Sequence, residues 1–314
     1  MVELEDKTPG AAPKILSNGA HPLVLQQKSA VFCQNVKKSY DGKRILQDID
    51  LALAPGSFNS FVGPSGSGKS TMLRLILGQE FPDSGILEIN QQPVSFPDAS
   101  RGVVFQKYSL YPHRTVLGNI TLGIELGMWL WQRIGKHAEI KERAYHFLEM
   151  VSLADHADLY PHQLSGGQCQ RVAIAQALIM EPKIILMDEP FGALDPGTRE
   201  SMQVCILKLW ERLNKERIMT IVFVTHDLEE ALYLGTRILV LSQYYEDSLP
   251  GPRGSRIVYD RALPSQALST KVKETAEFGK LLQEVRYSGF DPNNHQTVEH
   301  FNLSHPDSFT TFGY

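Results

Sequence analysis

One loop of this sequence combines the residue types that bind a chain of phosphates. Its residues, in order, are Gly63, Pro64, Ser65, Gly66, Ser67, Gly68, Lys69, Ser70 and Thr71. The glycines allow successive backbone N–H groups to turn toward one anion, because no side chain stands in the way. Lys69 would bring a positive charge to the β- and γ-phosphates, and the Ser70 hydroxyl would ligate Mg²⁺. The loop therefore predicts a site for a nucleoside triphosphate and its metal ion.

The segments on either side of this loop have the patterns that such a site needs. Residues 57–62 are predicted to form a buried strand, and residues 72–77 a helix. A strand, a loop and a helix in that order form the context of the motif, and the helix N-terminus adds partial positive charge. Glycine and serine also occur in plain connecting loops, but Lys69 and Ser70 in register with both flanks favour phosphate binding.

Three further strands are predicted to carry polar side chains to one edge of a sheet. The apolar runs and the residues that follow them are 183–187 with Asp188 and Glu189, 221–224 with His226, and 101–105 with Gln106. Open α/β sheets bind ligands at the carboxyl ends of their strands. Asp188 would complete the Mg²⁺ shell, and Glu189 would orient or deprotonate an attacking water. Taken alone, Gln106 is typical of a solvated loop and His226 of a structural histidine.

A second pair of glycines precedes another predicted helix. Ser165 is followed by Gly166, Gly167 and Gln168, and the apolar spacing predicts a helix over residues 169–180. Ser165 is suited to cap this helix, and the glycines expose free N–H groups, which makes a second potential anion site. A capped helix with a flexible glycine pair is the alternative interpretation.

Composition restricts the class of protein. The chain has 314 residues, of which 42% are hydrophobic and 21% charged, with a formal net charge of -4. These values are typical of a globular chain with an ordinary core, and the charge gives no indication of nucleic-acid binding. Cys33, Cys169 and Cys205 are far apart and lack metal-ligand spacing, which indicates a reducing compartment.

No segment is predicted to enter a membrane. The first residues are acidic and lack the basic start and apolar run of a secretory signal. No stretch approaches the ~20 consecutive apolar residues that span a bilayer. Any role at a membrane is therefore expected to depend on a partner.

A hairpin is predicted before the phosphate loop. Strands at 31–36 and 45–51 flank Asp41-Gly42, a strong signal for a two-residue turn. Tyr40, beside that turn, fits an edge-strand residue or a ligand contact equally well.

Residues 115–160 have a different character, with helical periodicity at 139–153. An apolar insertion in this region contains Trp129 and Trp131. Tryptophans at that spacing fit a core position, and they also fit a surface that docks a partner.

Both ends of the chain are predicted to be less regular. Residues 1–30 are dense in helix and strand breakers. After residue 241, a Pro/Gly-rich link at 249–254 is followed by residues 256–259 and by a predicted helix at about 269–287. The end at 291–314 lacks periodicity and is predicted to be irregular or wrapped over the rest of the chain.

Together, these segments resemble the ATP-binding subunit of ATP-binding cassette (ABC) transporters over residues 31–241. The matching motifs are the aromatic loop at Tyr40, Walker A at 63–70, the Q-loop at Gln106, the signature at 164–168, Walker B at Asp188 and Glu189, the D-loop at 193–195 and the switch histidine His226. In that family the signature separates cassettes from other phosphate-loop proteins. Residues 187–195 and 224–231 are most similar to importers of nitrate, sulfonates and taurine.

The resemblance implies an α/β fold, a P-loop NTPase cassette with a mainly parallel core sheet, an antiparallel β subdomain and a helical signature subdomain. The cassette would cover residues 31–241, with the helical subdomain at 115–180. Residues 1–30 would form an irregular leader and residues 242–314 a C-terminal extension.

The resemblance also implies the roles of the residues that contact ATP. Tyr40 would stack on adenine, and Lys69 would hold the β- and γ-phosphates. Glu189 would be the general base, and His226 would contact the γ-phosphate. Hydrolysis would be phosphoryl transfer to water, with catalysis by positioning and electrostatics.

Other motif residues are implied to bind the metal ion or to act between subunits. Ser70, Gln106 and Asp188 would arrange Mg²⁺ and water. The residues expected to meet ATP outside the phosphate loop are Ser165, Gly166, Gly167 and Gln168 of the signature, which would close on ATP of the opposite subunit, and Asp195 of the D-loop.

The implied partners are transmembrane permease subunits, a second ATPase subunit that is identical or a sister cassette, and a solute-binding protein, with no nucleic acid. The chain would lie at the cytoplasmic face of the inner membrane. The alternative within the family is a soluble ABC ATPase that acts on ribosomes or nucleic-acid complexes. One motif set, no heptad run and a slightly negative charge favour the transporter. A phosphate-loop kinase is disfavoured by the signature, and the sequence does not name the cargo.

Overall fold

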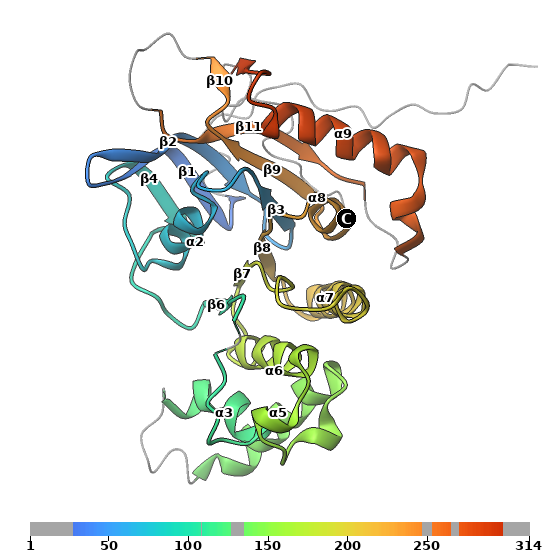
Figure 1. The fold of residues 1–314 in the computed structure, drawn as a ribbon. Coiled ribbons are helices and arrows are strands. Elements are labelled where there is room, and N and C mark those ends of the chain that lie inside the picture. The colour runs from blue at the N-terminus through green and yellow to red at the C-terminus, as the bar shows by residue number, and fades with distance from the viewer. Residues whose placement is uncertain (1–27, 108, 127–134, 247–252, 265–269, 298–314) are drawn as a thin grey trace, which may run out of the picture.

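The computed structural model describes residues 28–107, 109–126, 135–246, 253–264 and 270–297 (Figure 1). Its largest sheet has six strands in the order β11-β9-β3-β8-β7-β6. These strands are β3 (Phe58–Val62), β6 (Arg101–Val104), β7 (Ile184–Asp188), β8 (Thr220–Val224), β9 (Arg237–Ser242) and β11 (Arg256–Ala262). Neighbouring strands run parallel except β11, which pairs antiparallel with β9. The predicted mainly parallel core sheet is confirmed.

The central strands are apolar on both faces because helices cover both sides of the sheet. In β7, Ile184 and Leu186 belong to one buried cluster, whereas Ile185 and Met187 belong to another. The covering helices are α2 (Lys69–Leu77) on one side, and α7 (Pro196–Glu216), α8 (Leu228–Leu234) and α9 (Ala276–Phe290) on the other (Figure 1). Alternate residues of one strand therefore anchor opposite layers, which holds the strand ends at fixed positions.

A second sheet has four antiparallel strands in the order β2-β1-β4-β5. They are β1 (Val31–Tyr40), β2 (Lys43–Leu53), β4 (Ser84–Ile89) and β5 (Gln92–Pro93). The predicted hairpin turn is present, and Asp41 and Gly42 both have positive φ, at 49° and 78°. That conformation matches the twist of the two strands. Both strands are longer than predicted and reach the turn itself. The residues nearest the turn are polar, so the apolar pattern did not mark them as strand, although their backbones are paired.

Helices that follow β6 gather at one end of the molecule, away from α2 (Figure 1). They are α3 (Val116–Leu126), α5 (His137–Met150) and α6 (Gly166–Leu178), with short 3-10 helices at Ala154–His156 and Pro161–Gln163. The helical character predicted for this region is present. The insertion with Trp129 and Trp131 lies outside the described residues, as do residues 1–27 of the expected leader.

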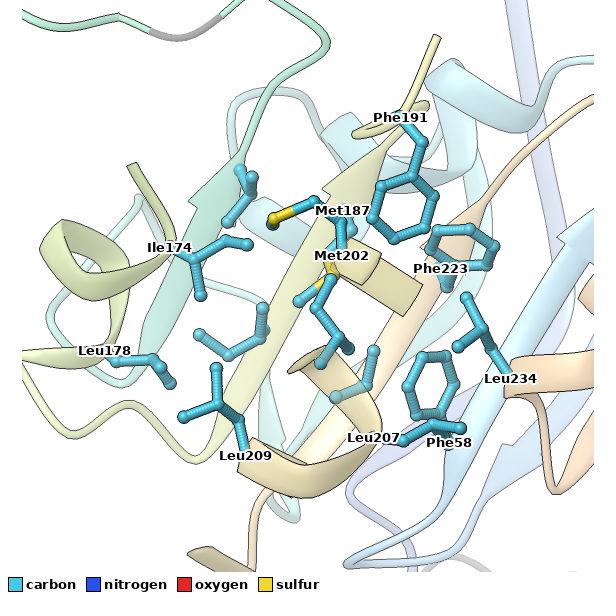
Figure 2. Packing of buried hydrophobic residues seen from close by; sticks show 14 of the residues in the cluster. Phe58, Ile174, Leu178, Met187, Phe191, Met202, Leu207, Leu209, Phe223 and Leu234 are labelled. Carbon is cyan, nitrogen blue, oxygen red and sulfur yellow. The ribbon is translucent and has the colours of Figure 1, made fainter. Parts of the chain in front are cut away.

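One large core joins the helical group to the central sheet (Figure 2). The rings of Phe58 and Phe223 pack edge to face with centroids 6.0 Å apart, and Phe191 lies 5.7 Å from Phe223. Ile174 of α6 and Met202 of α7 belong to the same cluster. Since Phe191 follows β7 by three residues, this packing fixes the turn beyond the end of that strand.

The chain after residue 241 takes part in the central sheet. Residues 256–259, for which no element was predicted, belong to β11, an edge strand that reaches Ala262. Arg237 of β9 and Asp260 of β11 form a bidentate pair, with N···O distances of 2.7 and 2.6 Å. A part of the segment expected as a C-terminal extension is thus joined to the central sheet by backbone pairing and a buried ion pair.

The helix predicted at 269–287 is present but begins later, and a separate 3-10 helix precedes it. A 3-10 helix spans Thr270–Glu274, and α9 begins after Thr275, whose hydroxyl accepts the N–H of Phe278 at 3.3 Å. Beyond α9, the strand β12 (Gln296–Thr297) pairs with β10 (Tyr245–Glu246). Part of the segment 291–314, which was expected to be irregular, therefore forms a short strand. The local sequence could not indicate this strand, because its partner lies far away along the chain.

Among the described residues, no helix has both the length and the apolar character needed to cross a bilayer. Cys33, Cys169 and Cys205 are free thiols.

Candidate active site

The phosphate-loop residues lie between β3 and α2, in the predicted order of elements. Gly68 is the N-cap of α2 in the left-handed region, at φ 85°, and no described side chain caps this helix. The first N–H groups of α2 are therefore available to an external anion. Gly63 lets the loop pass close to β9, because a Cβ there would lie 2.1 Å from the Leu241 carbonyl oxygen.

Lys69 begins α2 and turns back over its own loop. Its Nζ donates to the carbonyl oxygens of Gly63 at 2.8 Å and Pro64 at 2.9 Å. Burial lowers the pKa of Lys69, and the nearby charges of Glu189 and Asp188 oppose that shift. A bound phosphate would offer this ammonium a charged partner in place of two neutral carbonyls.

Asp188 ends β7 opposite the start of α2. Its Oδ1 lies 3.5 Å from the Ser70 hydroxyl, at the limit of a hydrogen bond. Burial raises the pKa of Asp188, and the neighbouring charge of Glu189 adds to the rise. This half-buried carboxylate is therefore in surroundings that would favour a nearby positive charge.

Glu189 is held between two strand ends. Its backbone N–H donates to the Val224 carbonyl of β8 at 2.8 Å, and its Oε2 lies 3.2 Å from Nδ1 of His226. The register that pairs Asp188 with Val224 brings the two strand ends together, as the sequence predicted. Glu189 has φ 46°, an unfavourable value for a residue with a side chain. The fold thus maintains a strained backbone at the residue that presents this carboxylate to His226.

Gln106 lies two residues beyond β6, which pairs with β7 through Val104 and Met187. A Cβ added to Gly192 would lie 2.8 Å from Gln106 Nε2. The exposed Gln106 amide therefore lies against the turn that follows Glu189, near the same edge of the sheet.

Tyr40 ends β1 and lies beside α2. Its hydroxyl donates to Glu80 Oε2 and accepts from Arg74 Nη2 at 3.3 Å. The Nζ of Lys38 lies 5.4 Å from the ring centroid, and the Cζ of Arg74 lies 5.9 Å from it. A cation near the face of an aromatic ring makes a favourable contact. The ring expected to stack on adenine therefore has two basic side chains beside it.

The signature residues are positioned as a helix start. Ser165 caps α6: its Oγ accepts the Gln168 N–H at 3.3 Å, and its own N–H donates to Gln168 Oε1 at 2.8 Å. Asp195 caps α7, where its Oδ1 accepts the Thr198 N–H at 3.0 Å. Figure 1 places α6 in the helical group, apart from α2. Within one chain, the structure does not bring the signature to the phosphate loop.

Comparison with known proteins decides the family. The family model described as ABC transporter matches residues 46–192. The chain is 39% identical over 80% of its length to the nitrate import ATP-binding protein of Synechocystis, and covers 91% of that relative. It is 43% identical over 75% of its length to the spermidine/putrescine import ATP-binding protein of Marinobacter nauticus, and covers 60% of it.

The chain belongs to the ABC transporter ATP-binding subunits. A solved dimeric structure of a bacterial ABC transporter cassette agrees, with a TM-score of 0.59 and 34% identity, covering 75% of this chain and 99% of that one. The predicted cassette fold is confirmed. This ABC subunit binds ATP and hydrolyses it.

Two residues of this ABC subunit were missed by sequence reasoning. Arg74 Nε lies 2.9 Å from Glu80 Oε1, and both side chains contact Tyr40. Arg74 follows Lys69 by five residues, so it was visible on the predicted helix. Its partner Tyr40 comes from the antiparallel sheet, however, and no spacing along the chain connects the two.

The two signature glycines should respond differently to alanine. A Cβ at Gly166 would meet only Leu194 Cδ2, at 3.9 Å, whereas a Cβ at Gly167 would lie 2.3 Å from Thr198 Cγ2. We expect Gly167→Ala to lower the free energy of unfolding by about 1–3 kcal/mol, because Thr198 must move. We expect the free energy of unfolding of Gly166→Ala to lie within about 0.5 kcal/mol of that of the parent chain.

Denaturant unfolding and ATPase assays on both variants test this expectation. Loss of ATPase activity in the stable Gly166→Ala variant would assign that glycine to the nucleotide. Full activity there would contradict a role for Gly166 at ATP, and equal stability of the two variants would contradict the packing argument.

Proposed function

We propose that this chain is the ATPase subunit of an importer for a small solute, most similar to the nitrate, sulfonate and taurine type. The similarity over 91% of the nitrate import ATP-binding protein carries this proposal. The spermidine/putrescine relative shares more identity but is covered over only 60% of its length. It therefore supports a role in import but does not indicate the transported solute. The subunit would lie at the cytoplasmic face of the membrane, bound to separate permease subunits and served by a solute-binding protein.

In the proposed reaction, Glu189 orients and deprotonates the water that attacks the γ-phosphate. His226 contacts the same carboxylate at 3.2 Å, which limits its rotation, and would also meet the γ-phosphate. Lys69 would exchange its loop carbonyls for phosphate oxygens, and Gln106 would align the water from the neighbouring strand end. These groups act by positioning and charge, the main sources of catalysis in phosphoryl transfer. Tyr40 would stack on adenine beside the start of β2.

The oxygens of Ser70 and Asp188 fit Mg²⁺. They are hard donors 3.5 Å apart, and burial raises the pKa of Asp188, so a bound cation would favour its charged form. Among the described residues, no group of three or more His, Cys, Asp or Glu could hold a metal. ATP phosphates and water would therefore supply the remaining ligands, as is usual for Mg²⁺. When bound, the ion would neutralise charge on the phosphate oxygens.

We propose that two cassettes, identical or sister chains, close head to tail on ATP. The signature of one subunit would cover ATP held by the phosphate loop of the other, and Asp195 would lie near the same interface. The separation of α6 from α2 supports this arrangement, because one chain alone leaves the signature without a nucleotide. The dimeric form of the solved relative also supports it.

Gentle solubilisation of native membranes, purification of the tagged chain and mass spectrometry would test the proposal. We expect polytopic membrane proteins to co-purify in stoichiometric amounts, and their identity would indicate the cargo. The same membranes without the tag serve as the control. Recovery of the chain alone, or with ribosomes or nucleic acid, would contradict the transporter and favour a soluble ABC ATPase.

A further inference from the structure

The loop that carries His226 is fixed through the residue before it. The Thr225 N–H donates to the Phe61 carbonyl at 3.2 Å. Its hydroxyl donates to Glu230 Oε2 at 2.9 Å and accepts the Asp227 N–H at 3.0 Å. Thr225 is fully buried, so solvent cannot replace these bonds. The peptide between His226 and Asp227 is therefore held by the Thr225 hydroxyl, whose own position depends on Glu230.

Glu230 in turn depends on α7. Its side chain is buried, and burial raises the pKa of its carboxyl group. Gln203 Nε2 donates to Glu230 Oε1 at 3.3 Å, and Arg199 Nε lies 3.6 Å from the same oxygen. A buried carboxylate that lost one of these donors would turn toward another partner, because an unsatisfied buried charge is costly.

The amide of Gln203 is held by Glu230 on one side and on the other by Lys273, which lies in the described C-terminal segment, residues 270–297. Lys273 Nζ donates to Gln203 Oε1 at 2.8 Å and lies 4.6 Å from the centroid of the Tyr233 ring. An ammonium has only donors, so it can meet only the amide oxygen. That contact leaves the amide NH₂ facing Glu230. Without it, the Gln203 amide oxygen would lose its partner, and the side chain would be freer to turn away from Glu230.

The same C-terminal segment also approaches His226 from outside the loop. A groove of about 630 Å³ is lined by His226 and Glu229 on one side and by Leu282, Arg286 and Phe290 of α9 on the other. Lys273 and α9 thus reach the histidine loop by two routes. Figure 1 shows α9 on the same side of the sheet as α8, which begins just after that loop.

We propose that Lys273 is a positioning residue for ATP hydrolysis, acting through Gln203, Glu230 and Thr225 on the loop that carries His226. The inference rests on the proposed role of His226 at the γ-phosphate. It assigns to the C-terminal segment a part in the ATPase reaction, although no residue of that segment touches the phosphate loop among the contacts described above.

Steady-state ATPase kinetics of the full chain test this proposal with three variants. Lys273→Met removes the charge and the donors while keeping the length of the side chain. We expect it to lower kcat about tenfold and to leave the KM for ATP within about twofold, because ATP binding does not pass through this network. Lys273→Arg restores a donor and should recover most of the activity. Lys280→Met, at an exposed lysine of α9, is the matched control and should match the parent chain.

A double-variant comparison separates this proposal from the one on which it rests. If Lys273 acts through His226, Lys273→Met should cause no further loss of kcat in a His226→Ala background. A further tenfold loss there would overturn the proposal, as would parental kcat in Lys273→Met. Parental activity in His226→Ala would instead overturn the proposed role of His226. Thermal unfolding of each variant excludes a general loss of structure: a lowered melting temperature with KM and kcat changed together would contradict positioning.

Discussion

Replacing Glu189 with glutamine should reduce ATP turnover by about 10²- to 10⁴-fold, the usual contribution of a general base. Glutamine has the same shape, so it can keep the contact with His226 that holds Glu189 Oε2 at 3.2 Å from Nδ1. It cannot accept the proton of the attacking water. The backbone at φ 46° is equally unfavourable for both residues, so the substitution should not change the strain. Phosphate release at saturating ATP measures the effect.

The same variant should retain ATP and accumulate as a dimer. If hydrolysis opens the closed pair of cassettes, a subunit that binds ATP without hydrolysing it stays closed, and size-exclusion chromatography with ATP would detect the dimer. Glu229→Gln is the matched control, since Glu229 is an exposed carboxylate on the helix that follows His226. Parental turnover in Glu189→Gln would rule out Glu189 as the base. Low turnover without a dimer would contradict closure on ATP.

Removing Asp260 should cost about 3–5 kcal/mol of unfolding free energy, because it leaves the guanidinium of Arg237 buried without its counter-charge. Arg237 is 2% exposed and Asp260 6% exposed. Arg237 Nη1 also donates to the Ala52 carbonyl at 2.6 Å, so the pair links β9, β11 and the antiparallel sheet. A loss of this size is a large part of the about 5–15 kcal/mol that stabilises a typical domain. Denaturant unfolding of Asp260→Ala measures it.

A surface pair provides the control for this prediction. Arg212 and Glu216 are each more than half exposed and lie 3.8 Å apart on α7. Glu216→Ala should change stability by no more than about 0.5 kcal/mol, because solvent screens the exposed pair. The double variant Arg237→Met with Asp260→Leu should recover much of the loss, since it removes both buried charges. A change below 1 kcal/mol in Asp260→Ala would contradict the importance of the pair.

Local chemistry determined the parts of the site that lie close together along the chain. The phosphate loop could be predicted because glycine, lysine and serine must follow one another between a strand and a helix. Ser165 could be predicted as a cap because its partner Gln168 is three residues away. The polar residues at strand ends, Asp188 and His226, could be predicted because parallel strands in one sheet end at the same edge. In each case the physical constraint acts within a few residues or through a general rule of the fold.

Away from the shared ends of the parallel strands, tertiary structure alone decided which distant residues meet. The pairing of β11 with β9, and with it Arg237 and Asp260, adds part of the expected extension to the central sheet. The contact of Lys273 with Gln203 joins residues separated by 70 positions. Hydrophobic periodicity and turn signals report only the local conformation of a segment, so they do not reveal its neighbour across a sheet or beneath a helix. Those choices depend on which surfaces can be buried together once the whole chain has folded.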